Sequence, residues 1–266
     1  MTKRRVAQVE YQTAIHVRFD CQTGNLFMHM LLSLKLRRYV PLSQGEIDAL
    51  GHVCRHSIGT ARAHRDIIRQ GDAPHPVKLI VDGWAVRYKM LPDARRQIVS
   101  LLLPGDLCDF NGFLLKEMDH SVGALTPVTY AEMPHDLIEA MCEHHPALAR
   151  ALGLESLVVA AIQREWTLSL GQRTARERIA HLFCEIFERL EMVNLTEGGR
   201  CEMPLTQVDL GEITGMTTVH VNRTLQALRR EGLIVLDNRI LTIPDRRALM
   251  TVGMFNPNYL HHRNPI

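Results

Sequence analysis

The stretch PLTQVDLGEITGMTTVHVNRTLQALRREGLI, residues 204–234, constrains the fold more than any other part of the chain. Two short amphipathic segments flank a Gly-Met-Thr turn. Thr206 is a suitable N-cap for the first segment, with Asp209 three positions later, and we expect this helix to run to about Thr214. Gly215 can adopt the positive φ that ends a helix in a tight turn, and Gly211 allows a neighbouring helix to approach closely. The stretch therefore predicts two helices joined by a tight turn.

The second predicted helix, which Thr217 can cap, has two unlike faces. At ~100° per residue, one face collects the cap and the aliphatic side chains: Thr217, Val221, Leu225 and Leu228. The opposite face carries amide and guanidinium groups that can bond base edges and phosphates: Val219, Asn222, Arg223, Gln226 and Arg230, with His220 at its margin. This is the layout of a helix-turn-helix. An ordinary helical hairpin with a solvated arginine face is the alternative.

The segment GLIVLDNRILTI, residues 232–243, has two apolar runs around Asp237-Asn238 and predicts a hairpin beside the second helix, as in a winged helix-turn-helix. Residues 173–247 hold eleven arginines and eleven acidic residues, so this region is not basic as a whole. Residues 217–230, however, hold three arginines and no acid. Such local asymmetry is sufficient for contact with phosphates.

The N-terminal half has a different pattern. Residues 30–56 read as helical, with Ser43 as a plausible N-cap and Glu46 at the capping-box spacing. Between about Arg62 and Met133, short β-prone runs alternate with turn signals, which predicts a small barrel or jelly-roll. Asp82-Gly83 between two such runs predicts a hairpin. The runs are ARAHRDII, VKLIV, WAVRYKML, RRQIVSLLL, SVGAL and VTYAEM.

A long helix is predicted over residues 144–172, where Pro146 suits the first helical position. Its apolar residues cover more than one stripe, which is typical of a helix that packs against its own domain and against something else. We expect a second copy of the same helix there, with an interface formed by Leu154, Leu157, Val158, Ala161 and Ile162. A further helix over residues 173–193 and a loop, NLTEGGR, lead into the helix-turn-helix.

Composition adds few constraints. The chain has 266 residues, 46% of them hydrophobic, and a formal net charge of +2, so a polybasic nucleic-acid tail is absent. No uninterrupted apolar run reaches the roughly 18 residues of a membrane span. The basic N-terminus lacks the apolar core of a secretory signal. We expect a soluble, cytoplasmic protein without a membrane partner.

Six cysteines are scattered singly, which favours buried, reduced thiols over disulfides or a zinc site. A redox switch at Cys108 or Cys184 would need an exposed thiol with a lowered pKa. In HVCRH, His52 and His56 lie one helical turn apart with Cys54 between them, but no third ligand follows at a fixed distance, so no metal site is expected. Neither nucleophile, phosphate-loop, zinc-protease nor dinucleotide motifs occur, which argues against an enzyme.

The order of these parts resembles the Crp/Fnr superfamily of bacterial transcription regulators, over roughly residues 30–250. LLLPGDLCDFNGFL looks like the family's Gly-Asp turn and effector cassette, and TGMTTVHVNRTLQALRREGLI looks like its recognition helix. The resemblance implies an α+β chain that binds a pseudo-palindromic operator as a homodimer and contacts RNA polymerase. Its parts would be an extension at 1–27, a β-roll (jelly-roll) sensor of the cyclic-nucleotide-binding type at 28–145, a dimerisation helix at 146–172, a winged helix-turn-helix at 173–250 and a tail at 251–266.

The resemblance also assigns residues. Its DNA-binding set is Thr217, Thr218, Val219, His220, Asn222, Arg223, Gln226 and Arg230. Arg223 matches a guanine-reading arginine, and Val219 stands where relatives carry a glutamate that accepts from cytosine. Arg229 and Arg230 would meet phosphates if they contact DNA. A regulatory subunit that binds cyclic nucleotides and acts through protein contacts would not need this solvent-facing set.

The effector pocket that the resemblance implies is formed by Gly105, Asp106, Phe110, His120 and Ser121. Relatives that bind cyclic AMP carry a glutamate at the Phe110 position and an Arg-Ser pair where this chain has His120-Ser121. Phenylalanine cannot accept the ribose hydroxyl, and a neutral histidine lacks the fixed charge of arginine, so cyclic AMP is not expected. An iron–sulfur centre would need a cysteine cluster, but only Cys21 lies near the N-terminus. Effector and cofactor stay open.

Overall fold

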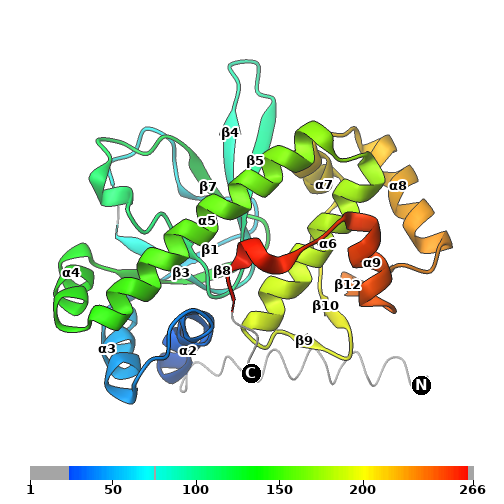
Figure 1. The fold of residues 1–266 in the computed structure, drawn as a ribbon. Coiled ribbons are helices and arrows are strands. Elements are labelled where there is room, and N and C mark those ends of the chain that lie inside the picture. The colour runs from blue at the N-terminus through cyan, green and yellow to red at the C-terminus, as the bar shows by residue number, and fades with distance from the viewer. Residues whose placement is uncertain (1–23, 75, 263–266) are drawn as a thin grey trace, which may run out of the picture.

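The computed structural model describes residues 24–74 and 76–262 (Figure 1). The described residues begin with two helices, α2 (Gly24–Arg37) and α3 (Gln44–Cys54). The predicted capping box is confirmed at the start of α3, where Ser43 Oγ accepts from the Glu46 N–H and Glu46 accepts from the Ser43 N–H. Residues 1–23 of the predicted extension, Cys21 included, lie outside the described residues, and residues 24–27 belong to α2.

Two four-stranded antiparallel sheets form the sensor domain and confirm the predicted β-roll. One sheet has the order β1-β8-β3-β6, from Ser57–Ala61, Val128–Met133, Val77–Asp82 and Leu107–Cys108. The other has the order β2-β7-β4-β5, from Asp66–Ile68, Ser121–Ala124, Ala85–Met90 and Arg96–Leu102. A short 3₁₀ turn, η1 (Gly112–Leu114), follows β6. The sequence analysis missed β1 and β6.

The hairpin predicted at Asp82-Gly83 was wrong, because β3 and β4 belong to different sheets. Gly83 has a φ of 79°, and a Cβ there would lie 2.0 Å from the Pro127 carbonyl oxygen. The chain beyond Gly83 bonds to a distant turn, since the Trp84 N–H donates to Thr126 Oγ1 at 2.9 Å. The glycine therefore carries the chain from one sheet to the other. The next turn does form a hairpin, with Met90 of β4 paired to Arg96 of β5.

Helix α4 (His135–His144) precedes α5 (Pro146–Gln172), which has Pro146 in its first turn and crosses the sensor domain (Figure 1). The sequence analysis found no membrane span. By length and composition, however, α5 is the one helix of the described residues that could cross a membrane, with an 18-residue window of mean hydropathy 1.3. Only 39% of that window is buried. A long apolar helix of a soluble protein has the same properties, and part of α5 is left uncovered in a single chain.

The C-terminal part begins with α6 (Ala175–Met192), capped by a Thr174–Glu177 capping box. Residues predicted as a loop form a hairpin instead, β9 (Thr196–Glu197) and β10 (Arg200–Glu202). Its two turn glycines both have positive φ, which suits a two-residue hairpin turn. Helices α7 (Gln207–Thr214) and α8 (Thr218–Arg230) follow, then β11 (Val235–Asp237) and β12 (Ile240–Thr242). These strands complete a third sheet in the order β11-β12-β10-β9.

The last described residues do not extend away as the predicted tail. Helix α9 (Arg246–Gly253) packs on α6, and η2 (Pro257–Leu260) packs on α5. Phe255 and Leu260 are buried there. Up to residue 262, the end of the chain is therefore part of the C-terminal core.

Candidate nucleic-acid interface and sensor pocket

The turn between α7 and α8 is built as the sequence predicted. Asp209 accepts from the Thr206 N–H at 2.8 Å, and the Asp209 N–H donates back to Thr206 Oγ1 at 3.2 Å. Gly215 ends α7 with a φ of 65°. Gly211 has a different role from the predicted one. A Cβ added at this position would lie 2.7 Å from the Met216 carbonyl oxygen. Gly211 accommodates the turn's own backbone, rather than a neighbouring helix.

Helix α8 buries one face and exposes the other. Its buried residues are Val221, Thr224, Leu225 and Leu228. Thr217 was placed on the buried face by the sequence analysis, but it is an exposed cap whose Oγ1 accepts from the His220 N–H at 3.3 Å. Thr224 takes its place on the buried face and donates to the His220 carbonyl at 2.9 Å. The exposed set is Thr217, Thr218, Val219, Asn222, Arg223, Gln226 and Arg230, with His220 half-buried.

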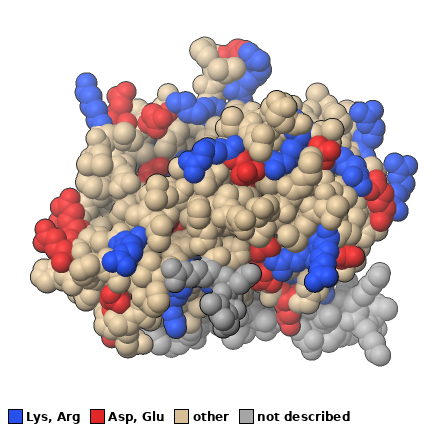
Figure 2. All heavy atoms as spheres, in the orientation of Figure 1, with Lys and Arg blue, Asp and Glu red and all other residues tan. Residues whose placement is uncertain are grey.

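Two features of the exposed face matter for recognition. Val219 is 78% exposed, so its alkyl group stands free at the start of the helix. Arginine side chains project at the edge of the molecule where α8 lies (Figure 2), since this part of the chain has no lysine. Arg229 does not share this exposure: it is half-buried and donates to the Leu236 carbonyl at 3.1 Å. Arg229 therefore joins α8 to the wing, whereas it had been expected to meet phosphates.

The predicted wing is confirmed as β11 and β12. Its two-residue turn is Asn238-Arg239, one residue later than the sequence analysis placed it, and both residues have positive φ, at 49° and 61°. These angles suit the tight turn that a right-twisted hairpin favours. Leu241 of β12 is fully buried and pairs with Cys201 of β10. The wing is thus fixed to the same core as α8.

The sensor domain and α5 line a solvent-open cavity of about 460 Å³. Phe110 and His120, two of the five predicted pocket residues, line it. The other lining residues are Arg87, Lys89, Val99, Leu107, Asp109, Asn111, Asp119, Glu155, Ser156, Val159 and Gln163. Ser121 instead accepts from the Gln70 N–H at 3.0 Å, and Gly105 forms a turn against Leu31 and Val193. Three of the predicted pocket residues, Asp106 among them, therefore lie away from this cavity.

Four charged groups of the cavity, those of Arg87, Asp109, Asp119 and His120, are paired with one another, whereas Lys89 donates to the Asp119 carbonyl and Glu155 accepts from Lys35. Arg87 Nε donates to Asp109 Oδ1 at 2.9 Å, and His120 Nε2 lies 3.0 Å from Asp109 Oδ2. His120 Nδ1 lies 2.7 Å from Asp119 Oδ1. Burial disfavours the imidazolium, but the bonds and charges of Asp109 and Asp119 outweigh it and raise the pKa of His120. These partners were not predicted from the sequence; Asp109 lies at a turn position with a φ of 52°.

Comparison with known proteins follows the same division of the chain. Residues 60–145 match the cyclic nucleotide-binding domain model, and residues 177–252 match the Crp-like helix-turn-helix domain model. A probable transcriptional activator of Rhizobium leguminosarum bv. viciae is 31% identical over 210 residues, which cover 78% of this chain and 85% of that protein. The transcriptional activator protein FnrL of Cereibacter sphaeroides is 32% identical over 181 residues, covering 67% and 72%.

The chain belongs to the Crp/Fnr family of transcription regulators. Its fold is also that of FixK2 from Bradyrhizobium japonicum, with a TM-score of 0.66 at 24% identity, covering 74% of this chain and 96% of FixK2. The family consists of DNA-binding regulators and not of enzymes.

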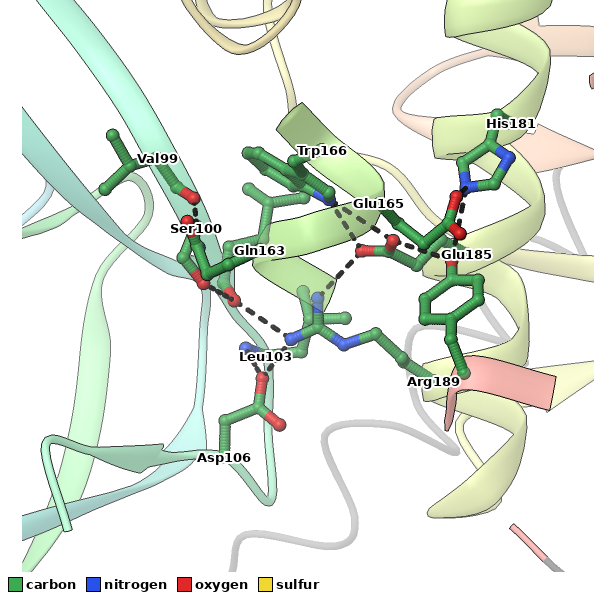
Figure 3. A network of polar contacts seen from close by, with 12 residues as sticks. Val99, Ser100, Leu103, Asp106, Gln163, Glu165, Trp166, His181, Glu185 and Arg189 are labelled. Carbon is green, nitrogen blue, oxygen red and sulfur yellow. Dashed lines mark hydrogen bonds and ion pairs between the residues drawn. The ribbon is translucent and has the colours of Figure 1, made fainter. Parts of the chain in front are cut away.

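In this Crp/Fnr regulator, Asp106 of the Gly-Asp turn faces the C-terminal domain (Figure 3). Its carboxylate accepts from Lys35 Nζ at 2.6 Å, from Arg189 at 2.5 Å and from the Leu103 N–H at 2.7 Å. Burial alone would raise the pKa of Asp106, but the two cations outweigh it and lower the pKa to about 2. Asp106 is therefore a buried carboxylate that is held ionised.

Arg189 of α6 extends this network into the C-terminal domain. It donates to the Leu101 carbonyl at 2.9 Å and to Glu185 at 3.3 Å. Glu185 is fully buried and also accepts from Trp166 Nε1 at 3.1 Å and from Tyr259 Oη at 2.8 Å. Burial raises the pKa of Glu185, although these donors and Arg189 partly offset it. The sensor, α5, α6 and the chain end thus share one buried polar network (Figure 3).

The described cysteines are free, and none has the environment of a reactive thiol. Burial raises the pKa of Cys108 and of Cys184 to about 12, which opposes a redox switch at either position. His52 and His56 do not share a helix face, since α3 ends at Cys54. Within residues 24–74 and 76–262, no cluster of three or more potential ligands could hold a metal ion. His144 ends α4, and His145 is the N-cap of α5.

Proposed function

We propose that this regulator binds a pseudo-palindromic operator in the cytoplasm as a homodimer, with α8 of each protomer in a major groove. The observation that carries the proposal is the exposed polar face of α8. It lies opposite the buried Val221 and Leu228 and beside a wing that is anchored to the same core. A regulatory subunit that acts only through protein contacts would have no use for such a face.

Three side chains have distinct roles in this proposal. Arg223 presents a guanidinium fork that matches guanine O6 and N7. Val219 cannot accept a hydrogen bond, so its exposed alkyl group packs against a thymine methyl group instead. Arg230 lies at the end of α8 and contacts a phosphate, which adds affinity without sequence preference. Thr217, Thr218, His220 and Gln226 complete the contact surface.

Dimerisation runs through α5, by a stripe that shares Leu154 and Leu157 with the predicted interface but not its other three residues. Val158, Ala161 and Ile162 are 3%, 4% and 6% exposed, because they pack inside their own protomer. A different face of α5 is open to solvent: Gly153, Leu157, Ala160, Arg164 and Leu168, with Leu154 half-buried beside them. Leu157 is 62% exposed at its centre. A second copy would cover this apolar stripe.

The sensor cavity takes an effector other than cyclic AMP. A cyclic phosphate needs a cation that is free to bind it, yet Arg87 and His120 are both bonded to Asp109, and Lys89 donates to the Asp119 carbonyl. Phe110 offers no acceptor for a ribose hydroxyl, and two carboxylates surround the place where the phosphate would bind. A change in the sensor domain would reach the DNA-binding domain through Asp106 and Arg189, which connect the Gly-Asp turn to α6.

On its operator, the dimer would act on transcription through RNA polymerase. The name of the similar Rhizobium leguminosarum protein, a probable transcriptional activator, supports this proposal. Whether this chain raises or lowers transcription depends on where its operators lie relative to promoters.

A gel-shift with genomic fragments tests the proposal. We expect a sequence-selective shift that weakens steeply with salt, because phosphate contacts release counterions. Sequencing of the bound fragments should return a motif with two-fold symmetry and half-sites about one helical turn apart. Fragments that bind without selectivity, or no shift at low salt, would favour a regulator that acts through protein contacts.

A further inference from the structure

Two side-chain amides bridge the helices of the helix-turn-helix. Gln207 is the first residue of α7, and Asn222 lies on the exposed face of α8, 15 positions later. Asn222 Nδ2 donates to Gln207 Oε1 at 3.2 Å. Both residues are exposed, on the side of the motif that carries Val219 and Arg223. The bond therefore lies on the surface that would face DNA.

We propose that Asn222 reads an adenine in the operator, and that Gln207 is a positioning residue that fixes the orientation of the Asn222 amide. This inference rests on the proposed function, since it requires α8 to lie in the major groove. It assigns a base to one recognition residue and adds a residue from α7 to the reading of sequence.

The chemistry of the amide explains why its orientation matters. Adenine presents N7 as an acceptor and its N6 amino group as a donor in the major groove, and an asparagine amide matches this pair with its own donor and acceptor. The Asn222 amide nitrogen carries two hydrogens. One is bonded to Gln207 Oε1, and the second can donate to N7 while Oδ1 accepts from N6.

Gln207 favours one of the two orientations of that amide while its own Oε1 faces Asn222, as it does in the structure. If the amide were flipped, Asn222 Oδ1 would face Gln207 Oε1, and two acceptors would be in contact without a hydrogen between them. The helices around the pair are fixed: Asp209 and Thr206 cap α7, and the buried Val221 anchors α8 beside Asn222. The hydrogen bond thus orders the amide before DNA arrives, which lowers the entropy lost on binding.

Gln207 could also affect affinity by contacting a phosphate itself, and a double-mutant cycle separates the two roles. Gln207→Ala, Asn222→Ala and the double variant are each tested by competition between operator fragments in which one base pair at a time is changed. The full-length chain is used throughout. Gln207→Glu keeps an acceptor for the Asn222 amide but adds a negative charge. Gln44→Ala, an exposed glutamine of α3 bonded to Asp48, is the matched control for loss of an amide.

For Asn222→Ala we expect the preference for adenine at one position of each half-site to fall about 5- to 150-fold. Gln207→Ala should lower the preference at the same position about 2- to 10-fold, and should lower it no further when Asn222 is already alanine. Gln207→Glu should weaken binding to all fragments but keep the preference for adenine. Gln44→Ala should match the wild type in every measurement.

The proposal is overturned if Gln207→Ala weakens binding to every fragment alike and its effect adds to that of Asn222→Ala. This is the behaviour expected of a phosphate contact. It is also overturned if Asn222→Ala keeps the full preference at every A·T pair. Wild-type protein that selects no symmetric site would contradict the proposed function itself. That outcome is distinguishable, because it appears before any variant is made.

Discussion

Arg189 in α6 donates to the carboxylate of Asp106 at 2.5 Å, across 83 positions of the chain. Asp106 belongs to the Gly-Asp turn of the sensor, whereas Arg189 belongs to the helix that leads into the DNA-binding domain. Both side chains are less than a tenth exposed. One buried ion pair therefore connects the part that would sense a signal to the part that would read DNA.

Breaking this pair should destabilise the protein strongly. Arg189→Met leaves Asp106 as a buried carboxylate with Lys35 as its remaining cation, and loss of one partner of a buried pair costs about 3–5 kcal/mol. Urea denaturation followed by circular dichroism measures the free energy of unfolding. We expect Arg189→Met and Asp106→Asn each to lower it, and the double variant to lose less than the sum of the two.

Arg95→Met provides the control for this experiment. Arg95 pairs with Asp93 on the surface, where its side chain is 76% exposed, and exposed pairs contribute about 1 kcal/mol at most. If Arg189→Met lowered the free energy of unfolding as little as Arg95→Met does, the buried pair would have no structural role. Strictly additive effects of the Asp106 and Arg189 substitutions would lead to the same conclusion.

His120 should make the stability of the sensor domain depend on pH. The carboxylates of Asp109 and Asp119 raise its pKa in the folded state above the ordinary value near 6.5. The protonated imidazole therefore stabilises the fold fully below about pH 6.5, and this contribution is lost as the pH rises through the higher, folded-state pKa. His120→Gln removes the titration, so the difference in melting temperature between wild type and variant should shrink from pH 6 towards pH 8.

Calorimetric or fluorescence melts at several pH values measure this difference. The comparison with His120→Gln cancels the contributions of other histidines to the pH dependence. One of these is His181, whose pKa is lowered to about 4 by burial and by Arg173. A difference in melting temperature that stays constant from pH 6 to pH 8, or grows, would show that His120 is not held as an imidazolium.

Local signals in the sequence predicted local structure well. The caps at Ser43, Thr206 and Thr217, the positive φ of Gly215 and the start of α5 at Pro146 each depend on neighbours within four residues. The periodicity of residues 217–230 separated most of the buried face of α8 from its exposed face. The exception was Thr217, where the helix cap overrides the periodic pattern.

Features that depend on distant partners were not predictable in this way. Asp82-Gly83 has the composition of a hairpin, but contact with Thr126 and Pro127 decides where the chain goes. Asp106 was assigned to the effector pocket, yet its carboxylate is bonded to Lys35 and Arg189 and does not line the cavity. In α5, apolar composition predicted that more than one face would be covered, but it could not show which face the protomer itself buries.

Cyclic AMP should bind weakly or not at all. The substitution His120→Arg should not restore tight binding, for two reasons: Phe110 still provides no acceptor for the ribose, and Asp109 and Asp119 would pair with the new guanidinium. Titration calorimetry at neutral pH measures this directly. Micromolar affinity in the wild type would contradict the assignment of the cavity.

Charging the open stripe of α5 should separate the protomers without unfolding them. Leu157→Asp places a carboxylate at an exposed position, which is costly only when a second copy covers it. We expect monomers in sedimentation velocity, an unchanged circular dichroism spectrum and loss of operator binding.

Val158→Asp distinguishes an interface residue from a core residue. Val158 is 3% exposed, so its carboxylate would be buried within the protomer and should lower the free energy of unfolding by ~2 kcal/mol or more. Leu157→Asp that still sediments as a dimer would place the dimer interface elsewhere.

Arg223 should determine one G·C pair of each half-site. It is exposed on α8, opposite the buried Leu225 and Leu228 as the chain turns, and its guanidinium fork can bond guanine O6 and N7 together. Arg223→Ala should therefore cost ~1–3 kcal/mol per half-site and relax the preference at that base pair. Selection from random DNA with wild type and variant measures this change.

Arg230→Ala is the matched comparison, because it removes the same guanidinium from the far end of the same helix. Because Arg230 contacts a phosphate, its removal should weaken binding to all sequences alike and reduce the slope of affinity against salt by about one.

Beside the base pair that Arg223 reads, the base pair that faces Val219 should favour thymine, since an alkyl group packs against the thymine methyl but cannot accept from cytosine. If the wild type and Arg223→Ala selected the same half-site, Arg223 would not read a base, and the register of α8 in the groove would have to be assigned anew.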